Sequence, residues 1–148
     1  MSSNVELENI CKLLEIKNFK GVFMMDEIAK INPSENESYI VNLQNSNEHG
    51  SHWCSVHKNR NNISYFDSYG APVPNEIRNR YKNNKIHNFQ SEDKKYPDKP
   101  LQTYSQVICG HLCVLFLLLS DKGNSFDKII SLLQSDINEV KTSINTNK

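Results

Sequence analysis

The sequence predicts an α+β domain in which a small mixed β-sheet packs on a central buried helix. Residues 52–59 and 63–69 are rich in aromatic and β-branched side chains, as strands are. Residues 109–124 are apolar on every side before the segment reaches Gly123, which is typical of a buried helix with a C-terminal stop. The chain has 148 residues, a length that predicts one domain spanning 1–148.

The first segment predicts an amphipathic helix, followed by a strand. Residues 4–19, NVELENICKLLEIKNF, repeat apolar side chains near a helical period, and Asn4 is a candidate N-cap. The next apolar stretch, 39–43, predicts a short strand that gives way to a loop of Asn, Ser and Gly residues. The apolar positions of the helix are Val5, Ile10, Leu13, Leu14 and Ile16.

The middle of the chain predicts a β-hairpin. Residues 52–59 and 63–69 flank the turn-forming sequence RNN. Residues 85–89, KIHNF, predict one more strand. The charged, proline-bearing segment 91–100 predicts a surface loop, and 126–144 again repeats apolar residues at helical spacing.

Composition argues against several classes of function. Seventeen Lys and Arg residues balance seventeen Asp and Glu residues, so no overall field favours nucleic acid or an anionic membrane as a partner. The first residues lack a basic and apolar leader pattern, and the longest apolar run, 112–119, is far shorter than the ~20 residues of a membrane span. We therefore expect a soluble, unsecreted protein whose four cysteines are reduced thiols.

The predicted hairpin carries an imidazole and a carboxylate. Because side chains alternate along a strand, His52 and Cys54 point to one face and Trp53 to the other. If the hairpin loop has an even number of residues, Cys54 pairs with Asp67, and His52 lies on the diagonal within reach of the carboxylate. If the pairing register of the two strands were shifted by one residue, His52 and Asp67 would lie on opposite faces of the sheet. In the first register Asp67 can fix the tautomer of His52 and free its other ring nitrogen to act as a base.

Cys109 is the candidate nucleophile for this base. It opens the predicted buried helix, where the helix N-terminus and an imidazolium neighbour both favour the thiolate. Gly110 beside it permits the close approach of another backbone. An acyl-transfer oxyanion could accept hydrogen bonds from the Cys109 backbone N–H and from the side-chain amide of Gln102 or Gln106.

Several sequence blocks resemble those of a known protease family. GSHWCSV, SYFDSYG and QTYSQVICGHLC are similar to the His-Trp, acidic and Gln-Cys-Gly blocks of the adenovirus proteinase, adenain, and its relatives in virophages, Maverick/Polinton elements and large DNA viruses. GVFMMDEI and YIVNLQNSNEHGSHW resemble further blocks upstream, so the resemblance covers roughly residues 5–120. More distantly, the same blocks resemble proteases specific for SUMO and other ubiquitin-like proteins.

The resemblance implies a role for each candidate residue. His52 would be the base, Asp67 the residue that orients it, and Cys109 the nucleophile. The oxyanion glutamine of the family lies seven residues before the cysteine, which selects Gln102 over Gln106. Asp67 stands where adenovirus enzymes often have Glu.

The resemblance also implies a fold and a function. The fold is that of adenain-like, papain-like cysteine proteases, and the function is endopeptidase cleavage of viral precursor proteins, foremost capsid components, during virion maturation. The alternative is an isopeptidase or processing protease for ubiquitin-like modifiers. Trp53 and Gly110 are expected to wall the substrate groove, and no metal or other cofactor is expected. The expected location is the virion and the interior of the infected cell, in the cytoplasm or a viral factory.

The resemblance also bears on activators of the expected protease, because the adenovirus relative is stimulated by DNA and by a short viral peptide. The sequence leaves a peptide activator open. A local basic run consists of Arg78, Arg80, Lys82 and Lys85, and on a helix the first, third and fourth would share one face. Because the chain has no net positive charge and exposed phosphate contacts bind weakly at physiological salt, we expect DNA to change the activity little.

Two other interpretations compete with the protease. HGSHWCSVH and CGHLC contain His and Cys ligands, but neither has the spacing of a zinc site, and strand alternation splits the first across two faces. A binding module that had lost catalysis would lack the Cys, His or Gln, and all three are present. The other cysteines, Cys11, Cys54 and Cys113, are expected to be buried as small apolar residues. The other histidines, His49, His57, His87 and His111, are expected at the surface or in loops.

Overall fold

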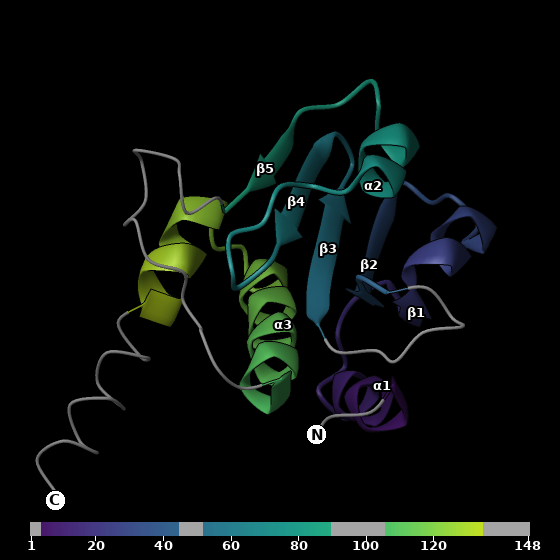
Figure 1. The fold of residues 1–148 in the computed structure, drawn as a ribbon. Helices are drawn as coiled ribbons and strands as arrows, with labels where there is room; N and C mark the ends of the chain where they lie inside the picture. The colour runs from purple at the N-terminus through teal and green to yellow at the C-terminus, as the bar shows by residue number, and fades with distance from the viewer. Residues whose placement is uncertain (1–3, 45–51, 90–105, 135–148) are drawn as a thin grey trace, which may run out of the picture.

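The computed structural model describes residues 4–44, 52–89 and 106–134, and these contain a five-stranded mixed sheet (Figure 1). The strands lie in the order of the sequence. The outer pairs, β1 with β2 and β4 with β5, are parallel, and the inner pairs are antiparallel. The predicted mixed sheet is therefore confirmed. Its strands are β1 (Phe19–Met24), β2 (Asn36–Asn42), β3 (Trp53–Asn59), β4 (Asn62–Phe66) and β5 (Ile86–Asn88).

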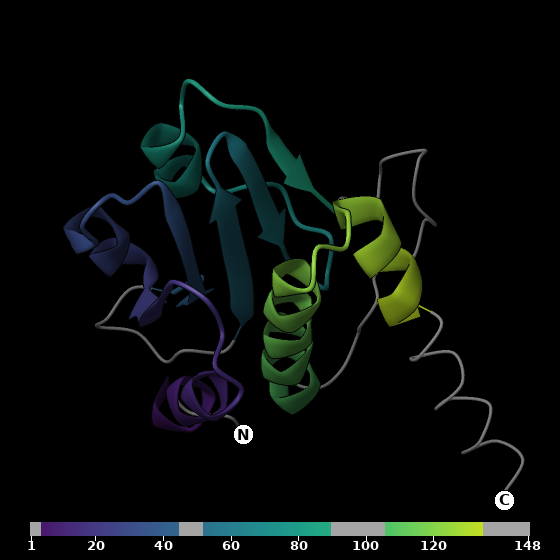
Figure 2. The same cartoon turned by 180° about the vertical axis from the view of Figure 1, so that it is seen from behind.

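Helices pack against both faces of the sheet. In Figures 1 and 2, α3 runs alongside β3, and α1 lies close to one end of α3. A further helical segment, 126–134, follows α3. The labelled helices are α1 (Asn4–Leu13), the 3₁₀ helix η1 (Met25–Lys30), α2 (Asn75–Arg80) and α3 (Gln106–Asp121).

The core is divided into two clusters by the sheet. Alternate residues of a strand point to opposite faces, so Ile40 and Trp53 join α1 and α3, whereas Tyr39 and Val56 join η1 and α2. Phe66 of β4 stacks on Phe116 of α3, with ring centroids 4.9 Å apart. This packing fixes α3 against the end of the sheet at which β3 begins.

The β3–β4 hairpin has the register that the sequence argument requires. Ser55 pairs with Phe66, and Asn59 pairs with Asn62, which leaves Arg60 and Asn61 as a loop with an even number of residues. Arg60 has a φ of 55°, a left-handed conformation of the kind found in tight hairpin turns. Continued by one residue, this register brings Asp67 next to Cys54.

The predicted strand ends are wrong by a few residues. Residues 52 and 67–69 lie outside the strands, because β3 begins at Trp53 and β4 ends at Phe66. The chain turns at Asp67, where the N–H of Gly70 donates to the Asp67 carbonyl over 2.9 Å. His52 and Asp67 therefore occupy strand ends, where side chains are less constrained by the alternation of the sheet.

Helix α1 buries a face that overlaps the predicted one only at Ile10, which is partly buried against the core. Leu7 and Cys11 are fully buried, whereas Val5 and Leu13 are 65% and 82% exposed. Because a helix turns 100° per residue, Val5 lies about 200° from Leu7. The buried apolar stripe of α1 is narrower than the predicted one, because only one side of the helix packs against α3 and the sheet. Of the other predicted positions, Ile16 is buried after the helix has ended.

Helix α2 ends earlier than the proposed basic face requires. It stops at Arg80, so Lys82 and Lys85 are not on it. Arg80 is also unavailable to contact DNA. Its guanidinium forms a buried ion pair with Glu37 of β2 and donates to the carbonyls of Ile28 and Ile31. This network ties α2 and η1 to the sheet, and the predicted helical row of three cations is wrong.

Helix α3 ends at Asp121, and Gly123 terminates it as predicted. This glycine has a φ of 89°, and its N–H donates to the Ser120 carbonyl over 3.0 Å. The N–H of Asn124 donates to the Leu119 carbonyl over 3.3 Å. The two bonds form a Schellman motif, which satisfies carbonyls at the end of the helix. Two predicted features differ. Cys109 does not open the helix, because α3 begins three residues earlier, at Gln106. Nor is α3 buried on every side, since His111 and Leu115 are exposed.

Some expectations fall on other parts of the chain. The predicted surface loop 91–100, the tail beyond 134, His49 and Gln102 lie outside the described residues. Within the described ranges, no helix is both long enough and apolar enough to cross a membrane.

Candidate active site

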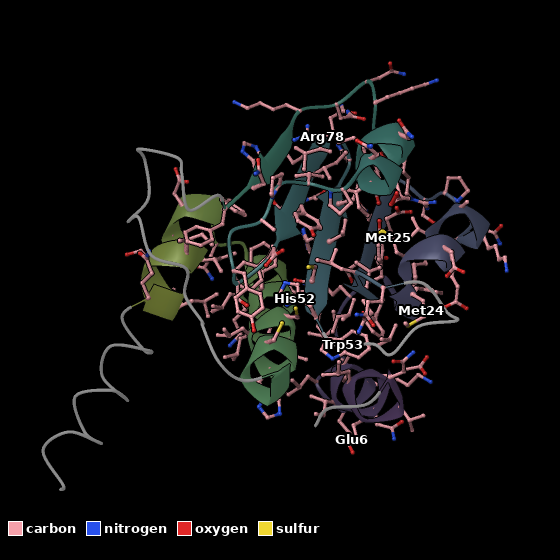
Figure 3. All side chains as sticks on the ribbon, viewed as in Figure 1. Glu6, Met24, Met25, His52, Trp53 and Arg78 are labelled. Carbon is pink, nitrogen blue, oxygen red and sulfur yellow. The ribbon has the colours of Figure 1, made fainter. Side chains whose placement is uncertain are left out.

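Three of the predicted site residues meet at one end of the sheet. His52 precedes β3, Asp67 follows β4, and Cys109 lies in the first described turn of α3. Figure 3 shows His52 and Trp53 at the end of β3 that lies beside α3. The Cys109 Sγ is 3.2 Å from the His52 Nδ1, and the His52 Nε2 is 2.7 Å from the Asp67 Oδ1. The thiol, imidazole and carboxylate therefore form a continuous hydrogen-bonded line.

The carboxylate is held by its own turn. Asp67 is fully buried, and its Oδ1 accepts hydrogen bonds from the His52 Nε2 and from the backbone N–H of Tyr69, the latter over 2.8 Å. A carboxylate that accepts the Nε2–H fixes the histidine tautomer, so the Nδ1 faces the sulfur. This arrangement orients the imidazole toward Cys109 before any substrate binds.

The backbone of β3 also contacts the sulfur. The Trp53 N–H donates to the Cys109 Sγ over 3.2 Å, and the Sγ lies 2.9 Å from the Trp53 carbonyl oxygen. A neutral thiol can donate its proton to this carbonyl, whereas a thiolate can accept from the N–H. Cys109 itself is fully buried, which places the sulfur in a site of low polarity where these few partners matter strongly.

The surroundings favour the ionised sulfur. The pKa of Cys109 is lowered to about 5, first by a hydrogen bond from the thiol of Cys113 one helical turn along α3. Burial acts in the opposite direction and raises the pKa, but the hydrogen bond and charge of His52 lower it further. Cys113, which was predicted to be buried, thus also favours the ionised form of Cys109.

The surroundings also favour the protonated imidazole. Burial by itself lowers the pKa of His52, but hydrogen bonds to Asp67 and Cys109 outweigh it and raise the pKa to about 9. Between the two pKa values, Cys109 is a thiolate and His52 is an imidazolium. Such a pair has an activated nucleophile and a proton ready for a leaving group.

Three neighbouring side chains offer ligand atoms of the kinds that bind metal ions. Ligand atoms of His52, Cys54 and Asp67 lie within 4.8 Å of one another. The 2.7 Å separation of the His52 Nε2 from the Asp67 Oδ1 is a hydrogen-bond distance, shorter than the roughly 3.3 Å between two ligands of a tetrahedral zinc ion. The contact is therefore that of a hydrogen-bonded pair, not of two zinc ligands.

The remaining predicted residues are placed as follows. Trp53 is buried in the cluster between the sheet and α3, and Gly110 is buried beside Cys109. Gln106 is the first residue of α3, and Gln102 lies outside the described residues. The predicted burial of three other cysteines, Cys11, Cys54 and Cys113, is confirmed.

Two residues of the site were missed by the sequence argument. The Ser68 Oγ lies 3.8 Å from the Cys109 Sγ, and the Tyr69 ring packs on the His52 ring with centroids 4.3 Å apart. The feature of the sequence that could have pointed to these two residues is DSYG, which is typical of a tight turn. A turn sequence alone does not show which way its two central side chains point.

Comparisons with known proteins give a likeness to a solved structure. No protein-family model matches the chain, and no curated protein matches it. Among solved structures, the chain is similar to the selenomethionine crystal structure of the ASFV pS273R protease, with a TM-score of 0.47 and 18% sequence identity. The match covers 68% of this chain and 40% of that chain, so this chain spans less than half the length of that protein.

Proposed function

We propose that this chain is a cysteine endopeptidase that cleaves viral precursor proteins, foremost capsid components, during virion maturation. The observation that carries the chemistry is the line from the Cys109 Sγ through His52 to Asp67, with separations of 3.2 and 2.7 Å. The choice of substrate rests on the resemblance of its sequence blocks to adenain.

The proposed reaction proceeds through an acyl-enzyme. The Cys109 thiolate attacks the scissile carbonyl carbon, and the oxyanion that forms accepts hydrogen bonds from the Cys109 N–H and the Gln102 amide. The tetrahedral intermediate collapses, the C–N bond breaks, and His52 gives its proton to the leaving amine. His52 then takes a proton from water as the water attacks the thioester. Collapse releases the carboxylic acid product and regenerates the thiolate, while Asp67 keeps the imidazole oriented.

The test offers the purified chain two substrate classes. One is a library of peptides with glycine before the scissile bond, as the relatives prefer, and the other is a set of ubiquitin-like precursors. Mass spectrometry identifies the cleaved bonds. Internal cleavage of library peptides supports the proposal, whereas cleavage restricted to the C-terminal tail of a ubiquitin-like precursor supports the alternative. Cleavage of neither class, by a protein whose Cys109 is alkylated normally, would contradict both.

The glutamine assignment gives a separate prediction. Gln102→Ala is expected to lower kcat by about 10²- to 10³-fold with little change in KM, because an oxyanion donor acts mainly in the transition state. Gln106→Ala is the matched control and should have a mild effect. Steady-state kinetics on a cleaved library peptide checks both. The opposite order of effects would place the oxyanion donor on α3 instead.

The activity is expected to follow a bell-shaped pH profile. Thiolate forms as the pH rises through about 5, the pKa of Cys109, so kcat/KM rises there. Imidazolium is lost as the pH rises through about 9, the pKa of His52, so kcat/KM falls there. Measurement of kcat/KM from pH 4 to 10 checks the prediction. A profile that begins to rise only near the ordinary thiol pKa would show that the ion pair does not form.

A further inference from the structure

The turn of residues 67–70 includes Asp67 and contacts the other two residues of the candidate site, His52 and Cys109. Asp67 begins the turn and accepts from His52. Its main chain is fixed by the 2.9 Å bond from the Gly70 N–H, and Gly70 has a φ of 74°, a conformation that glycine adopts at little cost. The two central residues, Ser68 and Tyr69, therefore project from a turn that is anchored at both ends.

Ser68 lies against the sulfur. The residue is fully buried, and its hydroxyl donates toward the Cys109 Sγ over 3.8 Å. This contact is long, but hydrogen bonds in active sites without substrate are often long and tighten as charge develops. A hydroxyl donor stabilises a thiolate more than a thiol, because only the thiolate carries a full negative charge.

Tyr69 lies against the imidazole. The two ring centroids are 4.3 Å apart with an interplanar angle of 32°, so the face of the tyrosine ring covers the histidine. An aromatic face attracts a cation, which stabilises imidazolium over neutral imidazole. The same residue donates its backbone N–H to the Asp67 Oδ1, so its ring and its main chain act on adjacent members of the line.

We propose that Ser68 and Tyr69 are positioning residues that stabilise the charged thiolate–imidazolium pair, Ser68 by its hydroxyl at the sulfur and Tyr69 by its ring on His52. The proposal deepens the proposed function and rests on it, because the charged pair matters only if Cys109 is the nucleophile. It assigns the turn after β4 two tasks: holding the carboxylate and stabilising the reactive ionisation state.

The experiment measures the two ionisations without any substrate. Iodoacetamide alkylation of Cys109, followed by mass spectrometry at each pH, reports the thiolate fraction. NMR of the His52 ring protons reports the imidazolium. The variants are Ser68→Ala, Tyr69→Ala and Tyr69→Phe. Ser55→Ala, which truncates another fully buried serine on β3, is the matched control.

Each variant has its own expected result. In Ser68→Ala, alkylation at pH 5 is expected to slow about threefold to fivefold, because less of Cys109 is ionised when a donor is lost. In Tyr69→Ala, the midpoint of the His52 titration is expected to fall by about half a pH unit or more. Tyr69→Phe keeps the ring and should restore most of this difference. Ser55→Ala should match the unmodified protein in both measurements.

Several outcomes would overturn the proposal. If Ser68→Ala is alkylated like Ser55→Ala, Ser68 does not stabilise the thiolate, and if Tyr69→Ala leaves the His52 midpoint unchanged, the ring contact has no electrostatic role. Should Ser68→Ala fail to fold, Ser68→Cys, which has a similar shape and a weaker donor, must slow the alkylation of Cys109 relative to Ser55→Ala. The proposed protease function is judged separately. If the ionisations are as expected but no peptide is cleaved, only the protease function is contradicted.

Discussion

Cys109→Ala is expected to abolish peptide cleavage, with a loss of at least ~10⁴-fold in kcat/KM, and to leave the fold unchanged. The reason is that the sulfur is the atom that attacks the carbonyl, and a methyl group cannot replace it. The residue lies in the first described turn of α3, and alanine is a strong helix former, so the helix should persist without the thiol. Kinetics on a cleaved peptide, with circular dichroism to monitor folding, checks the prediction.

Two other buried cysteines serve as controls for this substitution. Cys54→Ala and Cys11→Ala should keep most of the activity, since burial raises the pKa of both thiols and leaves them unreactive. Cys54 is the stricter control because it lies close to Asp67 and His52. Labelling of Cys54 by an active-site alkylating probe, or full activity in Cys109→Ala, would show that the nucleophile has been misassigned.

Asp67→Asn is expected to lower kcat/KM by about 10³- to 10⁴-fold. Asparagine has nearly the same shape, so the turn and the backbone contact of Tyr69 can persist. It carries no charge, however, and the interaction with Asp67 helps to raise the pKa of His52 to about 9. Without the carboxylate the pKa of His52 falls, the charged pair is less populated, and the tautomer that presents the Nδ1 to Cys109 is no longer enforced.

The measurement for Asp67→Asn is a full pH profile of kcat/KM. We expect the maximum kcat/KM to fall and the descending limb of the profile to move to lower pH. Asp67→Glu keeps the charge and should recover part of the activity, with the upper limb closer to that of the unmodified protein. If Asp67→Asn lost activity with an unchanged profile, the carboxylate would be a structural support without influence on the ionisation of His52.

The site could be predicted where its geometry follows from local rules. The pairing of Cys54 with the region of Asp67 follows from strand alternation and from the two-residue loop at Arg60. The end of α3 follows from the left-handed conformation of Gly123. Both features depend on residues that are close together in the sequence, so pattern and structure agree.

Other features depend on contacts that the sequence pattern does not encode. Strand β1 was not predicted, because it pairs in parallel with β2 and its register shifts around Gly21, which has a φ of 133°. A bulge of this kind interrupts the alternation by which a strand is recognised. Likewise, the contacts of Ser68 and Tyr69 depend on the direction of the turn in space, which neither spacing nor composition determines.

The two halves of the candidate site differ in how far apart their members are along the chain. His52 and Asp67 are 15 residues apart, within one hairpin, whereas Cys109 is 57 residues from His52. Closing the longer loop costs roughly 1 kcal/mol more in chain entropy than closing the shorter one. The base and its carboxylate can thus be assembled by a local folding step, but the sulfur joins them only when α3 docks. A partly folded chain of this kind would have an oriented imidazole and no activated nucleophile, so the proposed protease activity would begin only once α3 has docked.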